Sequence, residues 1–179
     1  MPDEIAPTER ISGSGEAAAG MLSRPTGARE HEGRFGTRSL RYEARLEETE
    51  VPDSGGTPGA QFVSFSYTAL GEDPRTRPVT FAFNGGPGSA SVWLHLGALG
   101  PQRIADSDSL TPRQVPPFHL VDNLDSPLDV TDIVLIDPPG TGYSRLLDEE
   151  KASDFYAPEP DARAVLQFIS TWCRRHHRE

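Results

Sequence analysis

A short apolar run that stops abruptly at a cluster of glycines is the feature that most limits how this chain can fold. Residues 79–83 are mainly β-branched and aromatic, and Asn-Gly-Gly-Pro-Gly follows at once at residues 84–88. From Val92 on, apolar residues recur at helical spacing. This order predicts a strand, a tight turn and a helix. Because glycines leave the main chain bare, the N–H groups of such a turn suit a negative charge at the mouth of the helix.

A second strand followed by glycines lies further along the chain. Residues 132–137 read Asp-Ile-Val-Leu-Ile-Asp, a continuous apolar run typical of a strand buried on both faces. Pro-Pro-Gly-Thr-Gly-Tyr-Ser follows directly at residues 138–144. Since both glycine segments come straight after strands, we expect them at the carboxyl edge of one sheet, where open α/β sheets bind their ligands.

The segment before the first glycine cluster predicts an antiparallel start to that sheet. Apolar and polar residues alternate over residues 40–46 and again over residues 62–68, which is the period of a strand. Pro-Asp-Ser-Gly-Gly at residues 52–56 supplies a strong turn between them. We therefore predict a hairpin here and, with the later segments, an α/β fold with a mixed sheet and flanking helices.

The two ends of the chain differ in character. Residues 1–33 are polar and aperiodic, so we interpret them as a flexible tail in front of a domain at residues 34–179. Residues 162–173 place apolar side chains at the spacing of an amphipathic helix, and a cluster of cations follows, as the helix dipole prefers.

Composition excludes several classes of function. The formal charge of −10 argues against a nucleic-acid partner, and no apolar stretch approaches the roughly 18 residues of a membrane span. The first residues lack the basic start and apolar stretch of a secretory signal, so we expect a cytoplasmic protein. With one cysteine, no internal disulfide is possible. We expect no cofactor and no metal, because His176 and His177 have no ligand partners at the right spacing and are interpreted as a solvated helix end.

Several reactive side chains are better explained by structure than by catalysis. Three serines lack the flanking glycines of a nucleophile elbow, so each is interpreted as a cap or turn hydroxyl: Ser89, Ser91 and Ser144. His95 lies within an apolar helical pattern and is predicted to be a packed core histidine. Three further residues are assigned to the core: Trp93, Trp172 and Cys173.

The two glycine segments, with Gly-Pro at residues 100–101 between them, resemble the serine carboxypeptidase family, and more narrowly its bacterial members. The resemblance covers residues 35–179 in matching order and spacing. It implies an α/β-hydrolase fold and acyl-enzyme chemistry by a triad of Ser, Asp and His.

The resemblance also implies roles for individual residues. Asn84 and Gly85 match positions that hydrogen-bond the terminal carboxylate of the substrate, and the N–H of Gly86 matches one of two oxyanion-hole donors. Three residues match a loop that shapes the site without taking part in proton transfer: Gly140, Gly142 and Tyr143.

This sequence departs from the family pattern at three places. Ala82 and Ala98 stand where the family usually has Trp and Glu, both part of the network that recognises the carboxylate. Ser89 replaces the disulfide cysteine of many secreted relatives. The nucleophile of the family lies in Gly-Glu-Ser-Tyr-Gly, whereas this chain contains no Gly-x-Ser-x-Gly segment. We therefore expect an N-terminal portion that is truncated before the nucleophile elbow, lacks the catalytic Ser, Asp and His, and is inactive alone.

Two classes of function follow. The first is a serine carboxypeptidase-like peptidase, or an esterase or acyltransferase of the same fold, acting on a peptide or ester in its full-length form. The second is a non-catalytic fragment that binds a carboxylate or a partner through the glycine segment. Because a central strand would be missing, we also expect Leu166, Ile169 and Trp172 to be partly bare, with marginal folding or self-association.

Overall fold

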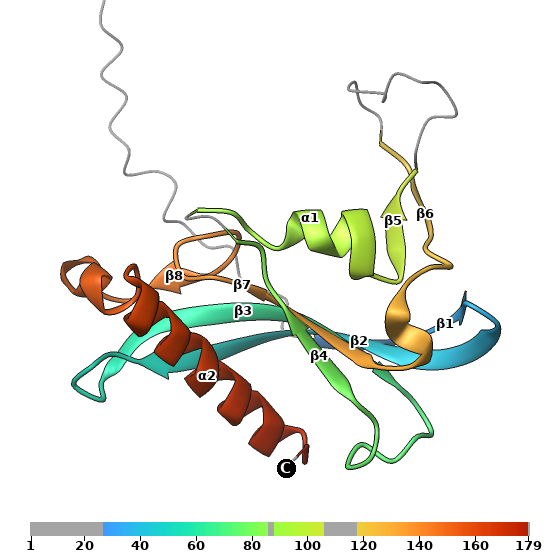
Figure 1. Ribbon diagram of the computed structural model, residues 1–179, viewed down its shortest axis with the longest axis horizontal. Coiled ribbons are helices and arrows are strands. Elements are labelled where there is room, and N and C mark those ends of the chain that lie inside the picture. The colour runs from blue at the N-terminus through green and yellow to red at the C-terminus, as the bar shows by residue number, and fades with distance from the viewer. Residues whose placement is uncertain (1–26, 86–87, 106–117, 179) are drawn as a thin grey trace, which may run out of the picture.

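The computed structural model describes residues 27–85, 88–105 and 118–178, which form a mixed β-sheet with helices packed on it (Figure 1). Five strands of the main sheet run in the order β1-β2-β3-β7-β4, and β8 pairs with β3. β5 and β6 form a separate two-stranded ribbon. The strands are β1 (Gly27–Phe35), β2 (Arg38–Pro52), β3 (Pro58–Ala69), β4 (Val79–Ala82), β5 (Gln102–Ile104), β6 (Leu120–Asp122), β7 (Asp132–Asp137) and β8 (Arg145–Leu146).

The main sheet starts antiparallel and becomes parallel at β4. β1, β2, β3 and β7 are antiparallel neighbours, whereas β4 pairs with β7 in parallel. The predicted hairpin is confirmed: β2 and β3 pair over most of their length, and the N–H of Asp53 donates to the carbonyl of Thr57 in the turn, at 2.8 Å. All six residues of β7 are buried, as the apolar run predicts. The α/β class with a mixed sheet is therefore confirmed.

One long helix and several short ones complete the fold. α2 (Pro158–Arg175) is the helix predicted from the apolar spacing near the C-terminus. α1 (Val92–Leu94) runs directly into a π-helical turn, η1 (His95–Leu99). The 3₁₀ turns η2 (Pro127–Asp129) and η3 (Glu149–Asp154) lie before β7 and before α2.

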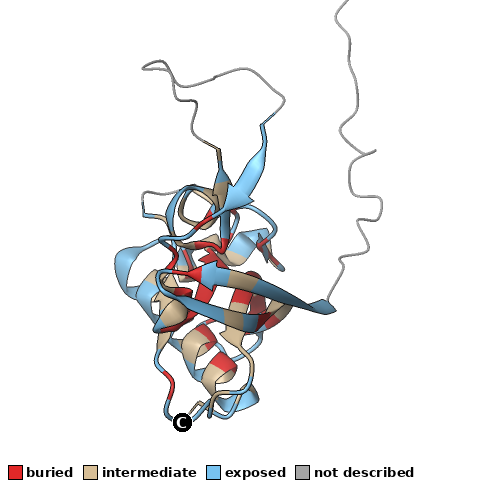
Figure 2. Ribbon diagram, turned by 90° about the vertical axis from the view of Figure 1, so that its right-hand side faces the viewer, coloured by how far each residue is buried: buried red, intermediate tan, exposed pale blue. Residues whose placement is uncertain are grey.

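β7 divides the core into two parts because its side chains alternate between the faces of the sheet. Val134 and Ile136 belong to the cluster under α2, and the neighbours Ile133 and Leu135 belong to the cluster on the other face. Leu94 and Leu99 of the α1–η1 segment pack against that second cluster. Figure 2 shows the buried positions in red, enclosed by the exposed outer segments. α2 and the α1–η1 segment therefore cover opposite faces, as in a three-layer α/β protein.

The inner side of α2 is held by aromatic contacts. Phe168 stacks on Phe62 with ring centroids 5.8 Å apart, and Trp172 meets Phe81 edge-on at 5.3 Å. Trp172 has an exposed fraction of 0%, so its assignment to the core is confirmed and the expectation that it is partly bare is wrong. Leu166 is 63% exposed, as expected. The self-association that we expected from such bare residues stays a prediction.

The predicted boundary of the N-terminal tail is wrong. Residues 27–33 belong to β1, which pairs with β2 along its whole length, from Gly27 opposite Leu46 to Phe35 opposite Arg38. The polar residues of β1 are exposed on both faces, so they show no alternation from which a strand could be predicted. The buried ring of Phe35 anchors the end of the strand instead. Residues 1–26 lie outside the described part of the chain.

The predicted packing of α1 is also wrong in part. Val92 and Trp93 are 46% and 71% exposed, so Trp93 is not a core residue. The physical reason is the change of helix type at His95: the N–H of Gly100 donates to the carbonyl of His95, five residues back, at 2.9 Å. The wider π turn shifts the side chains away from the α-helical spacing that the sequence suggests.

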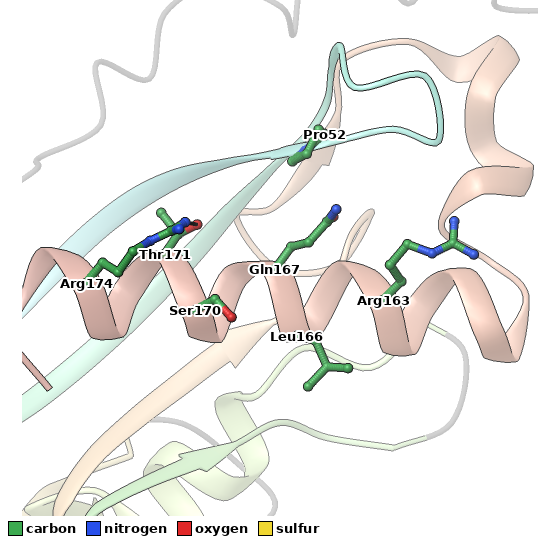
Figure 3. Close-up of a pocket in the computed structure, with 7 residues that line it drawn as sticks. All are labelled: Pro52, Arg163, Leu166, Gln167, Ser170, Thr171 and Arg174. Carbon is green, nitrogen blue, oxygen red and sulfur yellow. Dashed lines mark hydrogen bonds between the residues drawn. The ribbon is translucent and has the colours of Figure 1, made fainter. Parts of the chain in front are cut away.

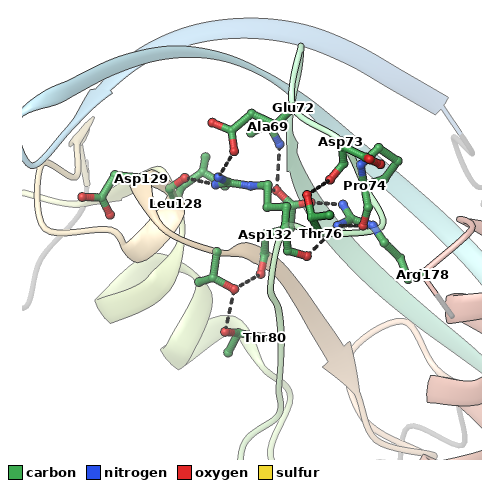
Figure 4. A network of polar contacts seen from close by, with 12 residues as sticks. Ala69, Glu72, Asp73, Pro74, Thr76, Thr80, Leu128, Asp129, Asp132 and Arg178 are labelled. Atoms are coloured by element: carbon green, nitrogen blue, oxygen red, sulfur yellow. Dashed lines mark hydrogen bonds and ion pairs between the residues drawn. The ribbon is translucent and has the colours of Figure 1, made fainter.

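A buried network of ion pairs holds the end of α2 against the sheet (Figure 4). At its centre Asp132, the first residue of β7, accepts bonds from Arg77 Nε and from the N–H of Ala69, at 2.7 and 2.8 Å, and pairs with Arg178. Arg77 also pairs with Glu72 at 2.6 Å. Because Arg178 comes from the segment after α2, this network fixes where the chain lies when it leaves the helix.

His176 is not the solvated residue that we predicted. Its ring stacks on Trp172, with centroids 4.3 Å apart, and its Nε2 lies 2.8 Å from the carboxylate of Glu47 on β2. His177, the adjacent residue, is exposed, as expected of a helix end. The sequence places both histidines after the last helical turn and gives no signal that distinguishes them.

Candidate functional site

The parallel pairing of β4 with β7 puts the two glycine segments at one edge of the sheet. Val79 lies opposite Asp132 and Ala82 opposite Leu135, so both strands end on the same side. The first loop follows β4, and the second follows β7. The position predicted for a ligand site, at the carboxyl edge of the sheet, is therefore where both loops start.

Asp137, the last residue of β7, connects these two loops. Its Oδ1 accepts a hydrogen bond from the N–H of Ser91 at 2.9 Å, and its Oδ2 accepts one from the N–H of Tyr143 at 3.2 Å. The residue is only 4% exposed. Both loops are therefore attached to opposite oxygens of one buried carboxylate, and hydrogen bonds to a charged group are among the stronger ones in proteins.

Gly142 is required by this same carboxylate. Its φ is +52°, in the left-handed region, and a Cβ added there would lie 2.1 Å from Asp137 Oδ2. Gly140 has a φ of +72°, and a Cβ there would lie 2.3 Å from the hydroxyl oxygen of Tyr156. Both glycines of the second loop are thus explained by close packing and backbone conformation.

Two of the candidate serines are fully used in holding the loops. Ser91 Oγ donates to the carbonyl of Ile136 and accepts from the N–H of Asn84 at 3.4 Å. Ser144 Oγ donates to the carbonyl of Asp137 and accepts from the N–H of Val63, both at 2.7 Å. These bonds confirm a structural role for both hydroxyls. Ser91 precedes α1 at the N-cap position, yet its hydroxyl bonds to β7 rather than capping the helix.

The first loop differs from the second because its described glycines face open space. A Cβ added at Gly85 or at Gly88 would meet no atom within 4 Å. Asn84, at the tip of β4, has a buried side-chain oxygen without a hydrogen-bond partner. Gly86, the predicted oxyanion-hole donor, lies outside the described residues. Of the two predicted substrate-binding residues, Gly85 therefore faces open space, whereas Asn84 is partly buried.

His95 lies beneath the loops as a packed histidine, as predicted. Its Nε2 is hydrogen-bonded to the hydroxyl of Tyr67, and its ring lies 5.0 Å from that of Phe65. Burial lowers the pKa of His95, an effect that the charge of Asp137 offsets only in part. Burial likewise raises the pKa of Tyr67 above its ordinary value. The histidine is therefore neutral near pH 7.

Other parts of the described structure do not add to this site. Between β2 and α2 lies a hollow of about 350 Å³ (Figure 3), and none of its lining residues belongs to either loop: Pro52, Arg163, Leu166, Gln167, Ser170, Thr171 and Arg174. Among the described residues, no three His, Cys, Asp or Glu side chains are grouped so that they could hold a metal ion. The helices in this part of the chain are too short or too polar to cross a bilayer.

The mixed sheet, with helices on its faces and two loops joined at its carboxyl edge, is consistent with a partial α/β fold. Comparison with known families gives the narrower result: this chain belongs to the serine carboxypeptidase family, whose model matches residues 61–179. The matched range contains both loops, Asp137 and α2. No curated protein matches the chain. The resemblance to the serine carboxypeptidase family is therefore confirmed over residues 61–179.

The sequence did not reveal how the two loops are connected. In the sequence, Asp137 is only the acidic end of an apolar run. Its position gives the one available signal, since it is an acidic residue that ends a fully buried strand directly before a glycine loop. A carboxylate that is buried there needs hydrogen-bond donors, and the main chain of flanking loops is the nearest source.

Proposed function

We propose that this chain carries the substrate-binding and oxyanion-binding loop of a serine carboxypeptidase-like peptidase, which hydrolyses the C-terminal peptide bond. Family membership supports the reaction class. The observation that carries the proposal is the connection through Asp137, which holds the open first loop at the edge of the sheet. A main-chain N–H group that is fixed in place can stabilise a developing negative charge without reorganising during the reaction.

The proposed chemistry is acyl transfer. A serine attacks the carbonyl carbon, a histidine takes the serine proton and gives it to the leaving amine as the C–N bond breaks, and water then releases the acyl group. The N–H of Gly86 would donate to the oxyanion, and loss of such a donor costs about 3–4 kcal/mol of transition-state stabilisation. Asn84 and Gly85 would hold the leaving end of the substrate. Gly140, Gly142 and Tyr143 would shape the site.

The nucleophile is not among the residues of this sequence. The 179 residues contain no Gly-x-Ser-x-Gly segment, so the reaction requires a serine and a histidine from outside them. We propose that these residues alone are inactive. An esterase or an acyltransferase of the same fold would use the same loop, because the oxyanion is common to all three reactions.

A fluorophosphonate probe tests this proposal, since it reacts with activated serines. The 179-residue chain should remain unlabelled, and a form of the protein with a Gly-x-Ser-x-Gly segment after residue 179 should be labelled. Replacement of the serine of that segment by alanine is the matched control and should abolish labelling. An unlabelled longer form that is folded, as judged by a cooperative melt, would reject the enzymatic proposal.

A non-catalytic binding function is the second candidate, and the lack of a nucleophile segment in these residues favours it. In that case the loop would bind a ligand without turning it over. Ligand-dependent shifts of the Gly85 amide signal, together with failure of every longer form to react with the probe, would support binding over hydrolysis.

A further inference from the structure

The hollow between β2 and α2 carries positive charge that is not used in ion pairs. Its lining includes Arg163 and Arg174 but no acidic residue. Both arginines are exposed, so a ligand can reach them from solvent. Within the described part of the chain, neither of them forms an ion pair, whereas the neighbouring Arg175 pairs with Glu47 at 3.6 Å. In a chain whose formal charge is −10, this hollow is a place that suits an acidic ligand.

The two arginines lie on one face of α2. They are eleven residues apart, which is about three full turns, so both side chains extend toward the side of Pro52 (Figure 3). Gln167 and Thr171 lie between them and line the same hollow. At roughly 1.5 Å per residue, the arginines are about 16 Å apart along the helix. An extended chain with two acidic side chains fits this separation better than a single small anion does.

Residues 3–9 of the same chain have that pattern of acidic side chains. They read Asp-Glu-Ile-Ala-Pro-Thr-Glu and precede the described part of the chain. Glu4 and Glu9 are five residues apart, which is also about 16 Å in an extended chain at roughly 3.3 Å per residue. Pro7 lies between them, and a proline favours an extended backbone at the residue before it. Residues 3–9 can therefore match both arginines at once.

The start of β1 brings this segment close to the hollow. Gly27, the first residue of β1, pairs with Leu46 of β2. The next residue of β2, Glu47, bonds to His176 directly after α2, at 2.8 Å. As a flexible chain, the seventeen residues between Glu9 and Gly27 would have a root-mean-square length of about 23 Å. A tether of this kind gives the segment an effective concentration near the hollow in the millimolar range.

We propose that the hollow between β2 and α2 is the docking site of residues 3–9 of the same chain, with Glu4 and Glu9 paired to Arg163 and Arg174. Ion pairs between exposed side chains are weak one by one. The tether makes two of them sufficient, because the segment does not have to be captured from solution. This docking does not depend on the proposed reaction, since no residue that lines the hollow belongs to either glycine loop.

A nitroxide at position 6 tests the docking in the 179-residue chain. The label is attached to Ala6→Cys in a Cys173→Ala background, which leaves one site of attachment. The amide signals of Gln167 and Thr171 should lose most of their intensity relative to the reduced label. The signal of Asn123, which bonds to the η1 segment on the opposite face, should be unchanged. In 1 M NaCl, where the screening length is about 3 Å, the loss of intensity should disappear. Full intensity at low salt, or a loss that persists in 1 M NaCl, would overturn the proposal.

Charge reversal identifies the paired residues. Glu4→Arg with Glu9→Arg should abolish the loss of intensity, and Arg163→Glu with Arg174→Glu should do the same. All four changes together should restore it, because opposite charges then face each other again. Glu16→Arg, the same change outside residues 3–9, should leave the loss in place. Since both arginines are exposed, their reversal should leave the urea midpoint unchanged, which shows that the variant is folded. A fourfold variant that does not restore the loss of intensity would reject the pairing.

Docking within one chain and docking between two copies give different results. A loss of intensity that increases with protein concentration would place the segment on a second copy and reject the proposal, whereas docking within the chain is independent of concentration. Fluorophosphonate labelling of a longer form depends on residues outside the hollow. The docking proposal and the proposed function can therefore fail separately.

Discussion

Removal of the Asp137 carboxylate should disconnect the two loops and destabilise the fold. The side chain accepts two buried hydrogen bonds, from Ser91 at 2.9 Å and from Tyr143 at 3.2 Å. A hydrogen bond to a charged group contributes about 1.5–3 kcal/mol, so Asp137→Ala should lower the free energy of unfolding by about 3–6 kcal/mol. That is a large part of the roughly 5–15 kcal/mol by which a domain is stable.

A milder variant keeps the test measurable if the alanine variant does not fold. Asp137→Asn has one acceptor oxygen and turns an NH₂ group toward the other main-chain N–H. Asp137→Asn should therefore lower the free energy of unfolding by half as much as Asp137→Ala, which is about 1.5–3 kcal/mol. Urea unfolding followed by the fluorescence of buried Trp172 measures the difference. Asp125→Asn makes the same chemical change at an exposed position, and it should change the stability by less than about 0.5 kcal/mol.

The connection of the loops also makes a local prediction. In Asp137→Asn, the amides of Ser91 and Tyr143 should exchange with solvent faster together, by more than the global loss of stability explains. An asparagine variant as stable as the Asp125→Asn control, with unchanged exchange at both amides, would refute the assignment of Asp137 as the connection between the loops.

Four further changes have defined outcomes. Gly142→Ala should lower the free energy of unfolding, measured with urea, by at least about 1–2 kcal/mol from the left-handed backbone alone. Its Cβ would in addition lie 2.1 Å from a carboxylate oxygen of Asp137. Trp172→Ala should lower the free energy of unfolding by about 3–5 kcal/mol, measured by urea unfolding followed by circular dichroism, whereas Trp93→Ala, at a 71% exposed side chain, should cost almost nothing. Burial alone would raise the pKa of Glu47, but His176 and nearby arginines hold that pKa below its ordinary 4.5. Its contribution is therefore present above pH 4.5 and lost as the pH falls through the lowered value, so Glu47→Gln should flatten the acid side of the stability curve, measured by urea unfolding at several pH values.

The sequence predicted the elements in which the spacing of apolar residues reflects which sides of the element are buried. β7 is an unbroken apolar run because both of its faces are covered. α2 repeats apolar residues at helical spacing because one side of it packs on the sheet. In each case the pattern and the packing have the same physical cause, so the sequence was sufficient.

The elements that were missed owe their structure to contacts between distant residues. β1 has polar side chains on both faces, and it becomes a strand only because β2 lies beside it. The turn of η1 depends on where His95 packs, against Phe65 and Tyr67 of β3. His176 is held by a carboxylate 129 positions earlier in the chain. The local spacing of apolar residues does not reflect contacts between distant residues, so a single sequence does not predict them.

The glycines of the candidate site show the same contrast between what the sequence predicts and what only the structure shows. Both loops were predicted from their glycines, but the sequence does not show which of these glycines are enclosed by side chains and which are open. The structure separates them: Gly140 and Gly142 are needed because side chains fill the space beside them, whereas Gly85 has open space where a side chain would be. Only a glycine with open space beside it can admit a ligand to its main chain. The second loop therefore supports the first through Asp137, and we propose that a ligand binds to the segment that follows β4, at Asn84 and Gly85.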